Sequence, residues 1–292
     1  MTSLHEVGWI RLGNDRLQLA IDPQGAQLSM LRDARGEDLL WSGDPAWWSG
    51  RAPILFPIVG ALRGGRYRWQ GRDYALPRHG FARGRRFEVV HAVPDAAVFR
   101  LRADEATRAV YPFEFELDLD FRLRGATLTV TAIARNVGRD LMPASLGFHP
   151  AFLRDGHRLV FEQAEAAPVR RLDADGLLSA VPRATPVTGR ELALADALFE
   201  EDVVIFDRLS SRSLSYRNDR GAEIEVGFPD AEYLGLWSKP GAPFVCIEPW
   251  RGVADPAGFE GDLHAKPGMH GLRPGDELRL TMCLTVRPPP AP

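Results

Sequence analysis

The sequence predicts an all-β protein, a large antiparallel β-sandwich. Three observations support this prediction: apolar and polar residues alternate along many short segments, turn residues separate those segments, and helical periodicity is nearly absent. The 292 residues include 28 glycines and 23 prolines, which mark turns at intervals typical of a sandwich. We therefore expect short strands with one apolar face, joined by tight turns.

The clearest strand is the segment 113–123, FEFELDLDFRL, in which phenylalanine and leucine alternate with charged residues. One face is apolar and the other is mostly acidic, as in a half-buried antiparallel strand. The segment 124–136, RGATLTVTAIARN, begins with an Arg-Gly turn and alternates again, so the two segments are predicted to form a hairpin. The other predicted strands are 16–21, 25–31, 66–76, 86–93, 96–103, 213–217, 222–228, 234–238, 244–250 and 277–286.

Helices and domain boundaries give weaker signals. The best helical candidate is the short segment 191–201, ELALADALFEE, and the last five residues, PPPAP, are predicted to form a tail. No linker rich in Gly, Ser or Pro divides the chain. We therefore expect a single domain over residues 1–292, with a core from about 15 to about 287.

Composition limits the possible partners. Lys and Arg total 36 against 39 Asp and Glu, a formal charge of −3, so nothing favours binding to nucleic acid or to an anionic membrane. The N-terminus lacks a signal-peptide pattern, and no apolar run is long enough to span a bilayer. Cys246 and Cys283 lie in apolar runs typical of buried free thiols. We expect a cytoplasmic protein, a monomer or weak homodimer, whose partner is a small molecule.

Three residues carry chemistry where the pattern predicts apolar or turn positions. They are His79 in RHGFAR, His149 in GFHPAF, and Glu248 in VCIEPW. Glu248 ends an apolar run, and desolvation raises a carboxyl pKa toward the range of a useful base at neutral pH. Taken one at a time, each residue can also be explained by a structural salt bridge or hydrogen bond.

The sequence motifs around these residues resemble those of one protein family. The motifs occur in this order: APILFPIVG, LPRHGFAR, YPFEFELDLDFRL, ARNVG, MPASLGFHPAF, FVCIEPWRGVAD and LRPGDELRL. Together they resemble the aldose 1-epimerases, or mutarotases, most closely the LacX-like branch near the hexose-6-phosphate mutarotases. The resemblance implies a β-supersandwich and no cofactor. It also implies that His79 binds substrate, that His149 is the general acid, and that Glu248 is the general base.

This chemistry needs an acid and a base. Conversion of an α-aldose to a β-aldose removes a proton from the C1 hydroxyl and delivers one to the ring oxygen, which opens the ring. Rotation about C1–C2 and reclosure complete the reaction. Glu248 is suited to take the hydroxyl proton, and His149, whose ordinary pKa is near 6.5, is suited to protonate the ring oxygen.

Further binding residues are implied less directly. By the resemblance, Arg51 contacts sugar hydroxyls, although it could also be a surface arginine. Asp202 matches the acid that grips hydroxyls, with Glu201 and Asp207 close enough in sequence to compete for that role. Trp237 lies on the predicted strand that precedes the strand of Glu248. It can pack against a sugar face or belong to the core.

The substrate class stays open between free aldoses and hexose 6-phosphates. Arg78 stands where relatives more often carry glutamine, and with Arg83 it could bind a phosphate. Arg78 could equally be a solvated turn residue. Trp47 and Trp48 are expected to be structural or to lie at the rim of the site.

Two other classes of function compete with a mutarotase. His79, His149 and Glu248 could form a two-histidine, one-carboxylate metal site. The same fold could also serve a sugar-binding or sugar-sensing protein without catalysis. The presence of both His149 and Glu248 argues against a pure binder, which needs no acid and base together.

Overall fold

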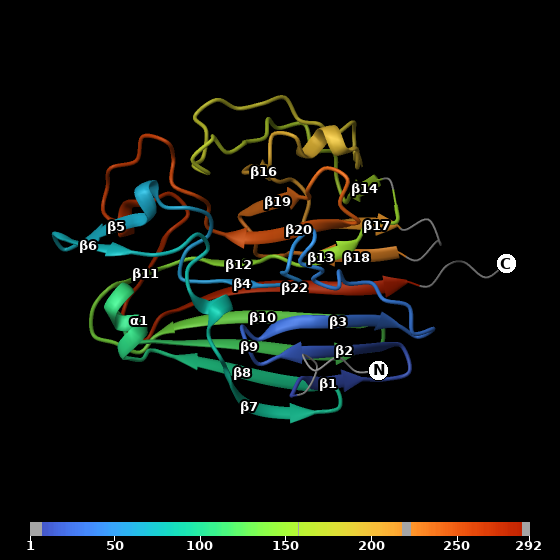
Figure 1. The fold of residues 1–292 in the computed structure, drawn as a ribbon, viewed down its shortest axis with the longest axis horizontal. Coiled ribbons are helices and arrows are strands. Elements are labelled where there is room, and N and C mark those ends of the chain that lie inside the picture. The colour runs from blue at the N-terminus through green and yellow to red at the C-terminus, as the bar shows by residue number, and fades with distance from the viewer. Residues whose placement is uncertain (1–7, 157, 218–222, 288–292) are drawn as a thin grey trace.

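The computed structural model describes residues 8–156, 158–217 and 223–287, and most of its regular secondary structure is antiparallel sheet (Figure 1). The all-β prediction is confirmed. The predicted tail at 288–292 lies outside the described residues. In Figure 1 the strands of the larger sheet between residues 88 and 136 cross the lower half of the view, and the smaller sheet, which carries the candidate site, lies above them.

The larger sheet has nine strands. In spatial order they are β15 (Glu191–Ala193), β14 (Arg158–Phe161), β17 (Ser213–Arg217), β18 (Glu223–Gly227), β22 (Glu277–Arg287), β10 (Thr127–Asn136), β9 (Phe115–Arg124), β8 (Ala96–Arg102) and β7 (Glu88–Val93). The predicted hairpin is present as β9 and β10, with Arg124 opposite Thr127. Leu117, Leu119 and Phe121 face the core. The apolar face predicted from the alternation is therefore the buried face of this strand.

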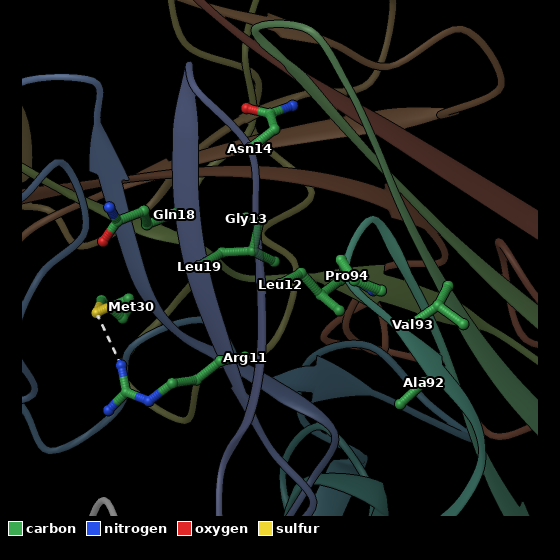
Figure 2. Close-up of a pocket in the computed structure, with 10 residues that line it drawn as sticks. All are labelled: Arg11, Leu12, Gly13, Asn14, Gln18, Leu19, Met30, Ala92, Val93 and Pro94. Carbon is green, nitrogen blue, oxygen red and sulfur yellow. Dashed lines mark hydrogen bonds between the residues drawn. The ribbon is translucent and has the colours of Figure 1, made fainter.

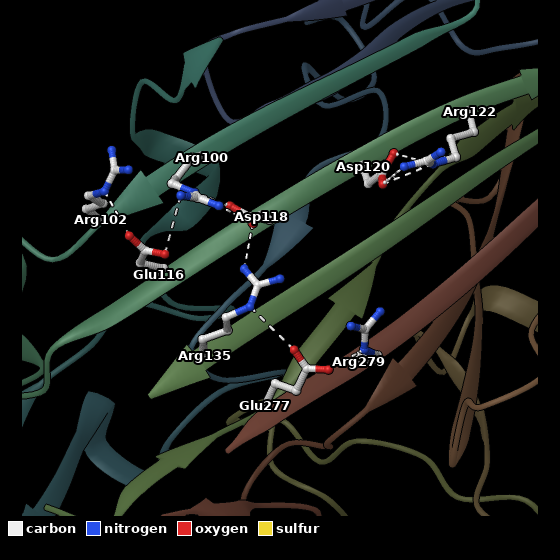
Figure 3. A network of polar contacts seen from close by, with 9 residues as sticks. All are labelled: Arg100, Arg102, Glu116, Asp118, Asp120, Arg122, Arg135, Glu277 and Arg279. Atoms are coloured by element: carbon white, nitrogen blue, oxygen red, sulfur yellow. Dashed lines mark hydrogen bonds and ion pairs between the residues drawn. The ribbon is translucent and has the colours of Figure 1, made fainter. Parts of the chain in front are cut away.

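The opposite face of this sheet carries an ion-pair network (Figure 3). Asp118 on β9 accepts hydrogen bonds from Arg100 on β8 at 2.6 and 2.7 Å and from Arg135 on β10 at 2.6 Å. Glu277 on β22 continues the network, 3.4 Å from Arg135. The acidic face read from the sequence is therefore paired with arginines across four strands.

The smaller sheet places the candidate residues. Its strands are β16 (Val204–Phe206), β19 (Tyr233–Trp237), β20 (Phe244–Arg251), β12 (Leu146–Phe148) and β4 (Ile54–Leu55), with β13 (Ala151–Leu153) also paired to β20. Along β20, Val245 and Ile247 pack into the main core. Cys246, Glu248 and Trp250 alternate with them, so they point to the other side of the sheet.

Shorter elements complete the fold. They are β1 (Ile10–Gly13), β2 (Leu17–Asp22) and β3 (Gln27–Asp33) in one sheet, the hairpin β5 (Arg66–Trp69) and β6 (Arg72–Ala75), the pair β11 (Met142–Ala144) and β21 (His270–Leu272), and 3₁₀ helices at Arg63–Gly65, Ala82–Gly84, Asp196–Phe199 and Leu263–Ala265. The first sheet meets the end of β7 through a 2.8 Å hydrogen bond from Gly13 N to Pro94 O. The run predicted at 66–76 is thus a hairpin with its turn at Gln70 and Gly71.

The helix predicted at 191–201 is wrong. Leu192 and Leu194 are buried while their neighbours are exposed, a period of two that forms β15, and only a 3₁₀ turn follows. The α-helix of the described residues is α1 (Glu105–Val110). It begins at a capping box between Asp104 and Thr107, with threonine where glutamate or glutamine is usual, and its six residues are too few to show a period.

Candidate active site

One cavity of about 270 Å³ gathers most of the candidate residues. Those that line it are Arg78, His79, Arg83, His149, Asp202, Trp237 and Glu248. They come from separate parts of the chain: the loop before β7, the turn between β12 and β13, the residue two before β16, and strands β19 and β20. The cavity therefore depends on the order of strands in the smaller sheet.

His149 and Glu248 meet at this cavity. His149 Nε2 lies 3.1 Å from Glu248 Oε2, and both residues are buried, at 8% and 1% exposure. Pairing of β13 with β20 brings them together, since Ala151 lies opposite Cys246 and Ile247 N donates to Pro150 O at 3.2 Å. Oε2 makes no hydrogen bond to another described residue. The pair is thus in position to pass a proton once its atoms align.

Burial sets the charge of this pair. Burial lowers the pKa of His149 from 6.5 to about 3. Burial, and then the charge of Asp202, raises the pKa of Glu248 well above its ordinary value. Both directions favour neutral side chains, as expected for ionisable groups removed from water. Burial thus favours a neutral imidazole beside a carboxyl that keeps its proton more readily than an exposed one.

His79 is fixed by its own backbone and by Gly60. His79 N donates to Gly60 O at 2.9 Å, and Gly60 N donates to His79 Nδ1 at 3.1 Å. Because Nδ1 accepts a hydrogen bond, the neutral ring carries its proton on Nε2. Burial, followed by the charges of His149, Arg83 and Arg78, lowers the pKa of His79 well below 6.5. His79 is therefore a neutral donor at the cavity wall.

Two tryptophans surround the His149 ring. Trp48 stacks on it with ring centroids 4.9 Å apart, and Trp237 meets it edge-on at 5.8 Å. Trp48 lines the cavity, which makes it more than the structural or rim residue expected from the sequence. Its ring lies over Gly50, where an added carbon would come within 2.4 Å of it. Only a residue without a side chain leaves this space, and the sequence WWSG does not by itself reveal the contact.

Asp202 is the one of the three competing acids that lines the cavity. Its backbone has a φ of 62°, and Arg171 Nη1 donates to its carbonyl at 2.8 Å. Glu201 instead lies 3.5 Å from Arg183, and Asp207 lies 3.7 Å from Arg170; neither acid lines the cavity. The loop geometry therefore directs the Asp202 carboxylate toward the site.

Positive charge gathers at the rim. Arg78, Arg83 and Lys239 all line the cavity, and Lys239 was not predicted from the sequence. Arg83 Nη2 donates to Arg78 O at 2.9 Å, and Arg78 packs against Gly176, where an added carbon would lie 1.9 Å from its Nη2. Burial and the charge of Arg78 lower the pKa of Arg83. Among the described residues, no carboxylate forms an ion pair with either arginine.

Arg51 does not belong to the lining of this cavity. Its Nε donates to Ser42 O at 2.5 Å, and its guanidinium lies 5.0 Å from the centre of the Trp9 ring. These contacts direct the side chain toward the N-terminal sheet. The expectation that Arg51 contacts sugar hydroxyls is therefore not supported by its position.

The side chains able to share a metal ion differ from the trio considered above. Within the described ranges, the grouping is His149, Cys246 and Glu248, whose ligand atoms lie within 4.8 Å of one another. His79 is not part of this grouping. Burial raises the pKa of the Cys246 thiol well above its ordinary value, so this group disfavours the thiolate that metals bind.

A second hollow, of about 610 Å³, lies between β1–β3 and the end of β7 (Figure 2). Arg11 is the charged residue of its lining, and it donates to Met30 Sδ at 3.9 Å. Figure 2 shows the other side chains around it, mostly aliphatic. With no acid or histidine in its lining, this hollow offers no group for proton transfer.

None of the helices in the described part of the chain has the length and apolar character needed to cross a bilayer.

Comparison with known proteins agrees with this geometry. The family model "Aldose 1-epimerase" matches residues 9–262. The chain is 31% identical to the chromosomal protein LacX of Lactococcus lactis subsp. lactis over 296 aligned positions, covering 95% of this chain and 99% of that protein.

Solved structures give the same result. A galactose mutarotase related enzyme from Lactobacillus acidophilus has a TM-score of 0.88 and 30% identity, covering 96% of this chain and 97% of that one. A galactose mutarotase-like protein from Lactobacillus casei has a TM-score of 0.90 and 28% identity, covering 96% and 100%. With the motifs and the fold, these matches lead to one assignment: the chain belongs to the aldose 1-epimerase family and is an isomerase acting on sugars.

Proposed function

We propose that the protein interconverts the α and β anomers of an aldohexose or its 6-phosphate by acid–base ring opening. The observation that carries this proposal is the buried His149–Glu248 pair, whose Nε2 and Oε2 atoms lie 3.1 Å apart at the cavity. Anomer exchange needs one proton taken and one proton given, which is what such a pair can supply. A pure sugar binder gains nothing from burying these two groups together.

The shifted pKa values of the pair suggest the first step, which starts from a neutral His149 and a protonated Glu248. Sugar hydroxyls entering the cavity replace lost hydration and favour charge separation, so the proton moves from Glu248 to His149. The Glu248 carboxylate then takes the C1 hydroxyl proton while the His149 imidazolium protonates the ring oxygen. The electron pair of the C1–O5 bond goes to O5, and C1 becomes an aldehyde. Reclosure after rotation about C1–C2 reverses both transfers.

Other residues of the lining hold the sugar in this scheme. His79 donates from Nε2 to the ring oxygen or to a neighbouring hydroxyl, and the Asp202 carboxylate accepts from hydroxyls. Trp48 and Trp237 offer ring faces and edges to the C–H groups of the sugar. No metal, nucleotide or redox cofactor takes part in these steps.

We further propose that the preferred substrate is anionic, in the class of hexose 6-phosphates. Arg78 and Arg83 line the rim, and neither forms an ion pair with a carboxylate among the described side chains. Two guanidinium groups held close together repel each other, and a phosphate bound between them relieves that repulsion. Lys239 adds a third cation.

Polarimetry tests this function. Freshly dissolved α-glucose, α-galactose and α-glucose 6-phosphate should equilibrate faster with the protein than without it, at a rate that EDTA leaves unchanged. Calorimetric binding of these sugars without faster equilibration would instead indicate a non-catalytic sugar-binding protein. Unchanged rates together with no binding across the panel would contradict the proposal.

A further inference from the structure

A lysine and an aspartate are buried together close to Ala254 of the cavity lining, at a separate hollow of about 360 Å³. Lys266 and Asp255 are each 3% exposed, and Lys266 Nζ lies 3.4 Å from Asp255 Oδ1. Lysine is almost never fully buried unless it is paired. Burial lowers the pKa of Lys266 to about 8, although Asp255 works against this shift. A buried ion pair contributes little net stability, so stability alone does not explain it.

The pair joins two segments of chain. Lys266 Nζ donates to Val253 O. Asp255 Oδ2 accepts from Arg63 N at 2.9 Å, and Asp255 N donates to Ala61 O at 2.9 Å. The segment after β20 is thereby held against the loop after β4, at the point where both reach the cavity.

The contact between these segments leaves no space for movement. A carbon added to Gly60 would lie 2.5 Å from Ala254 Cα, so the two backbones touch directly. Gly60 has a φ of 78°, which favours glycine. Gly60 is also the residue whose N donates to His79 Nδ1 and whose O accepts from His79 N. Any shift of segment 253–255 therefore reaches His79.

We propose that the Lys266–Asp255 ion pair is a positioning device that fixes the orientation and tautomer of His79. With Gly60 N held on Nδ1, the ring keeps its proton on Nε2 and presents a donor to the cavity. A ligand oxygen with a free lone pair is the group that this donor recognises. Loss of the pair frees Gly60 N, and the ring then exchanges between its two tautomers.

Nitrogen NMR of the sugar-free protein tests this inference without using activity. With ¹⁵N-histidine labelling and His79→Gln to assign the resonances, parent His79 should be almost wholly the Nε2–H tautomer. Lys266→Met should convert it to a mixture of tautomers. Glu165→Gln is the matched control: Glu165 is 2% exposed and accepts from Ser210 N and Ser211 N, and it does not line the cavity. The Glu165→Gln variant should be less stable than the parent, and its His79 tautomer should be unchanged.

Whether Lys266→Met folds decides which variant is measured. Removing one partner of a buried pair is strongly destabilising, whereas replacing both is tolerated better. If Lys266→Met does not fold, the double variant Lys266→Met/Asp255→Asn is measured in its place. An unchanged His79 tautomer in the folded variant, or an equal change in Glu165→Gln, would overturn the inference.

A second readout rests on the proposed function. In Lys266→Met, the His79 donor to the ligand is misplaced. KM of this variant should therefore rise about tenfold, while kcat changes less than about threefold. Glu165→Gln should keep the parent KM. If the parent does not equilibrate sugars at all, the proposed function fails, and the tautomer measurement still decides the role of the ion pair.

Discussion

Two residues of the candidate site have a positive backbone φ, which residues other than glycine rarely adopt. His79 has a φ of 68° and Asp202 a φ of 62°. Such conformations cost of order 1–3 kcal/mol each and persist where the surroundings hold them. Gly60 holds His79 through two hydrogen bonds, and Arg171 holds the Asp202 carbonyl. The fold thus tolerates local strain to direct these two side chains into one cavity.

The arginines of the rim lead to the first prediction. Arg83→Gln should lower kcat/KM for glucose 6-phosphate about tenfold or more, mainly through KM, because a remote phosphate contact contributes uniform binding. Its kcat/KM for glucose should change little. Steady-state kinetics with both sugars measures this ratio, and Arg86→Gln, in the same loop but outside the lining, is the control. Equal efficiencies for the two sugars in the parent would show that Arg83 recognises no phosphate.

Some site residues could be predicted from the sequence and others could not. His149 and Glu248 stand out because each is a polar residue in an apolar run followed by proline. Trp48 and Lys239 give no such signal, since a tryptophan or lysine in a loop is as typical of a rim or a surface. Arg51 has the expected sequence context, but its side chain turns toward Trp9.

At the scale of elements, alternation along β20 and the loop before β4 build the site together. β20 directs Glu248 away from the core, and the loop lays Trp48 on the ring of His149. Gly50 makes the second contact possible, because the Trp48 ring occupies the space of a side chain there.

This contact gives the second prediction. Gly50→Ala should displace the Trp48 ring from His149 and lower kcat about tenfold or more, as misplaced catalytic groups do. The protein should still fold, since Gly50 does not need a positive φ. Gly258→Ala is the control, because no atom lies within 4 Å of its added carbon. Parent kinetics in Gly50→Ala would mean that the stacking is not required.

Strands were predictable where helices were not. A period of two repeats several times within segments such as 113–123, so chance alternation is easily excluded. The α1 helix has six residues, fewer than two turns, and the leucines at 192 and 194 fit a strand as well as a helix. Short helical elements therefore depend on caps and tertiary contacts that a pattern does not contain.

Across the whole molecule, the nine-stranded sheet depends on charge pairs on the face away from the core. Asp118 is 4% exposed and receives hydrogen bonds from Arg100 and Arg135 (Figure 3). Burial alone raises its pKa, but these hydrogen bonds and charges outweigh it, so the pKa of Asp118 lies below 3.8. The folded state therefore stabilises the charged carboxylate.

The third prediction follows from this shift. Asp118→Asn should lower the free energy of unfolding at pH 7 by about 2 kcal/mol, because two arginines lose a buried partner. A carboxyl group whose pKa is lower in the folded than in the unfolded protein stabilises the fold. This contribution is complete at a pH above the unfolded-state pKa and is lost as the pH falls through the folded-state pKa. The difference between parent and variant should therefore shrink below pH 3.8.

Urea unfolding at several pH values measures this difference. Asp120→Asn is the matched control on the same strand, because Asp120 pairs with Arg122 at the surface and should matter by less than about 1 kcal/mol. A difference for Asp118→Asn that stays constant from pH 7 to well below 3.8 would contradict the assigned pKa direction.

The sequence predicted the class of fold and seven of the fifteen residues that line the cavity, but not how the lining assembles. Period-two segments show which residues share a face, and they do not show which strands are neighbours. His79, His149, Asp202 and Glu248 are far apart in the chain, and the order β16-β19-β20-β12-β4 brings them together. Strand order depends on long-range packing, so the resemblance to a family supplied what the pattern could not.

In the proposed function, His149 and Glu248 share the proton that opens the sugar ring. The most direct test compares anomer exchange in the parent, His149→Asn and Glu248→Gln, by polarimetry or NMR exchange with the best sugar of the panel. Each variant should fold and bind sugar, and each should lose at least about a hundredfold in kcat, because each removes one half of the proton transfer. Near-parent turnover in either folded variant would contradict the account.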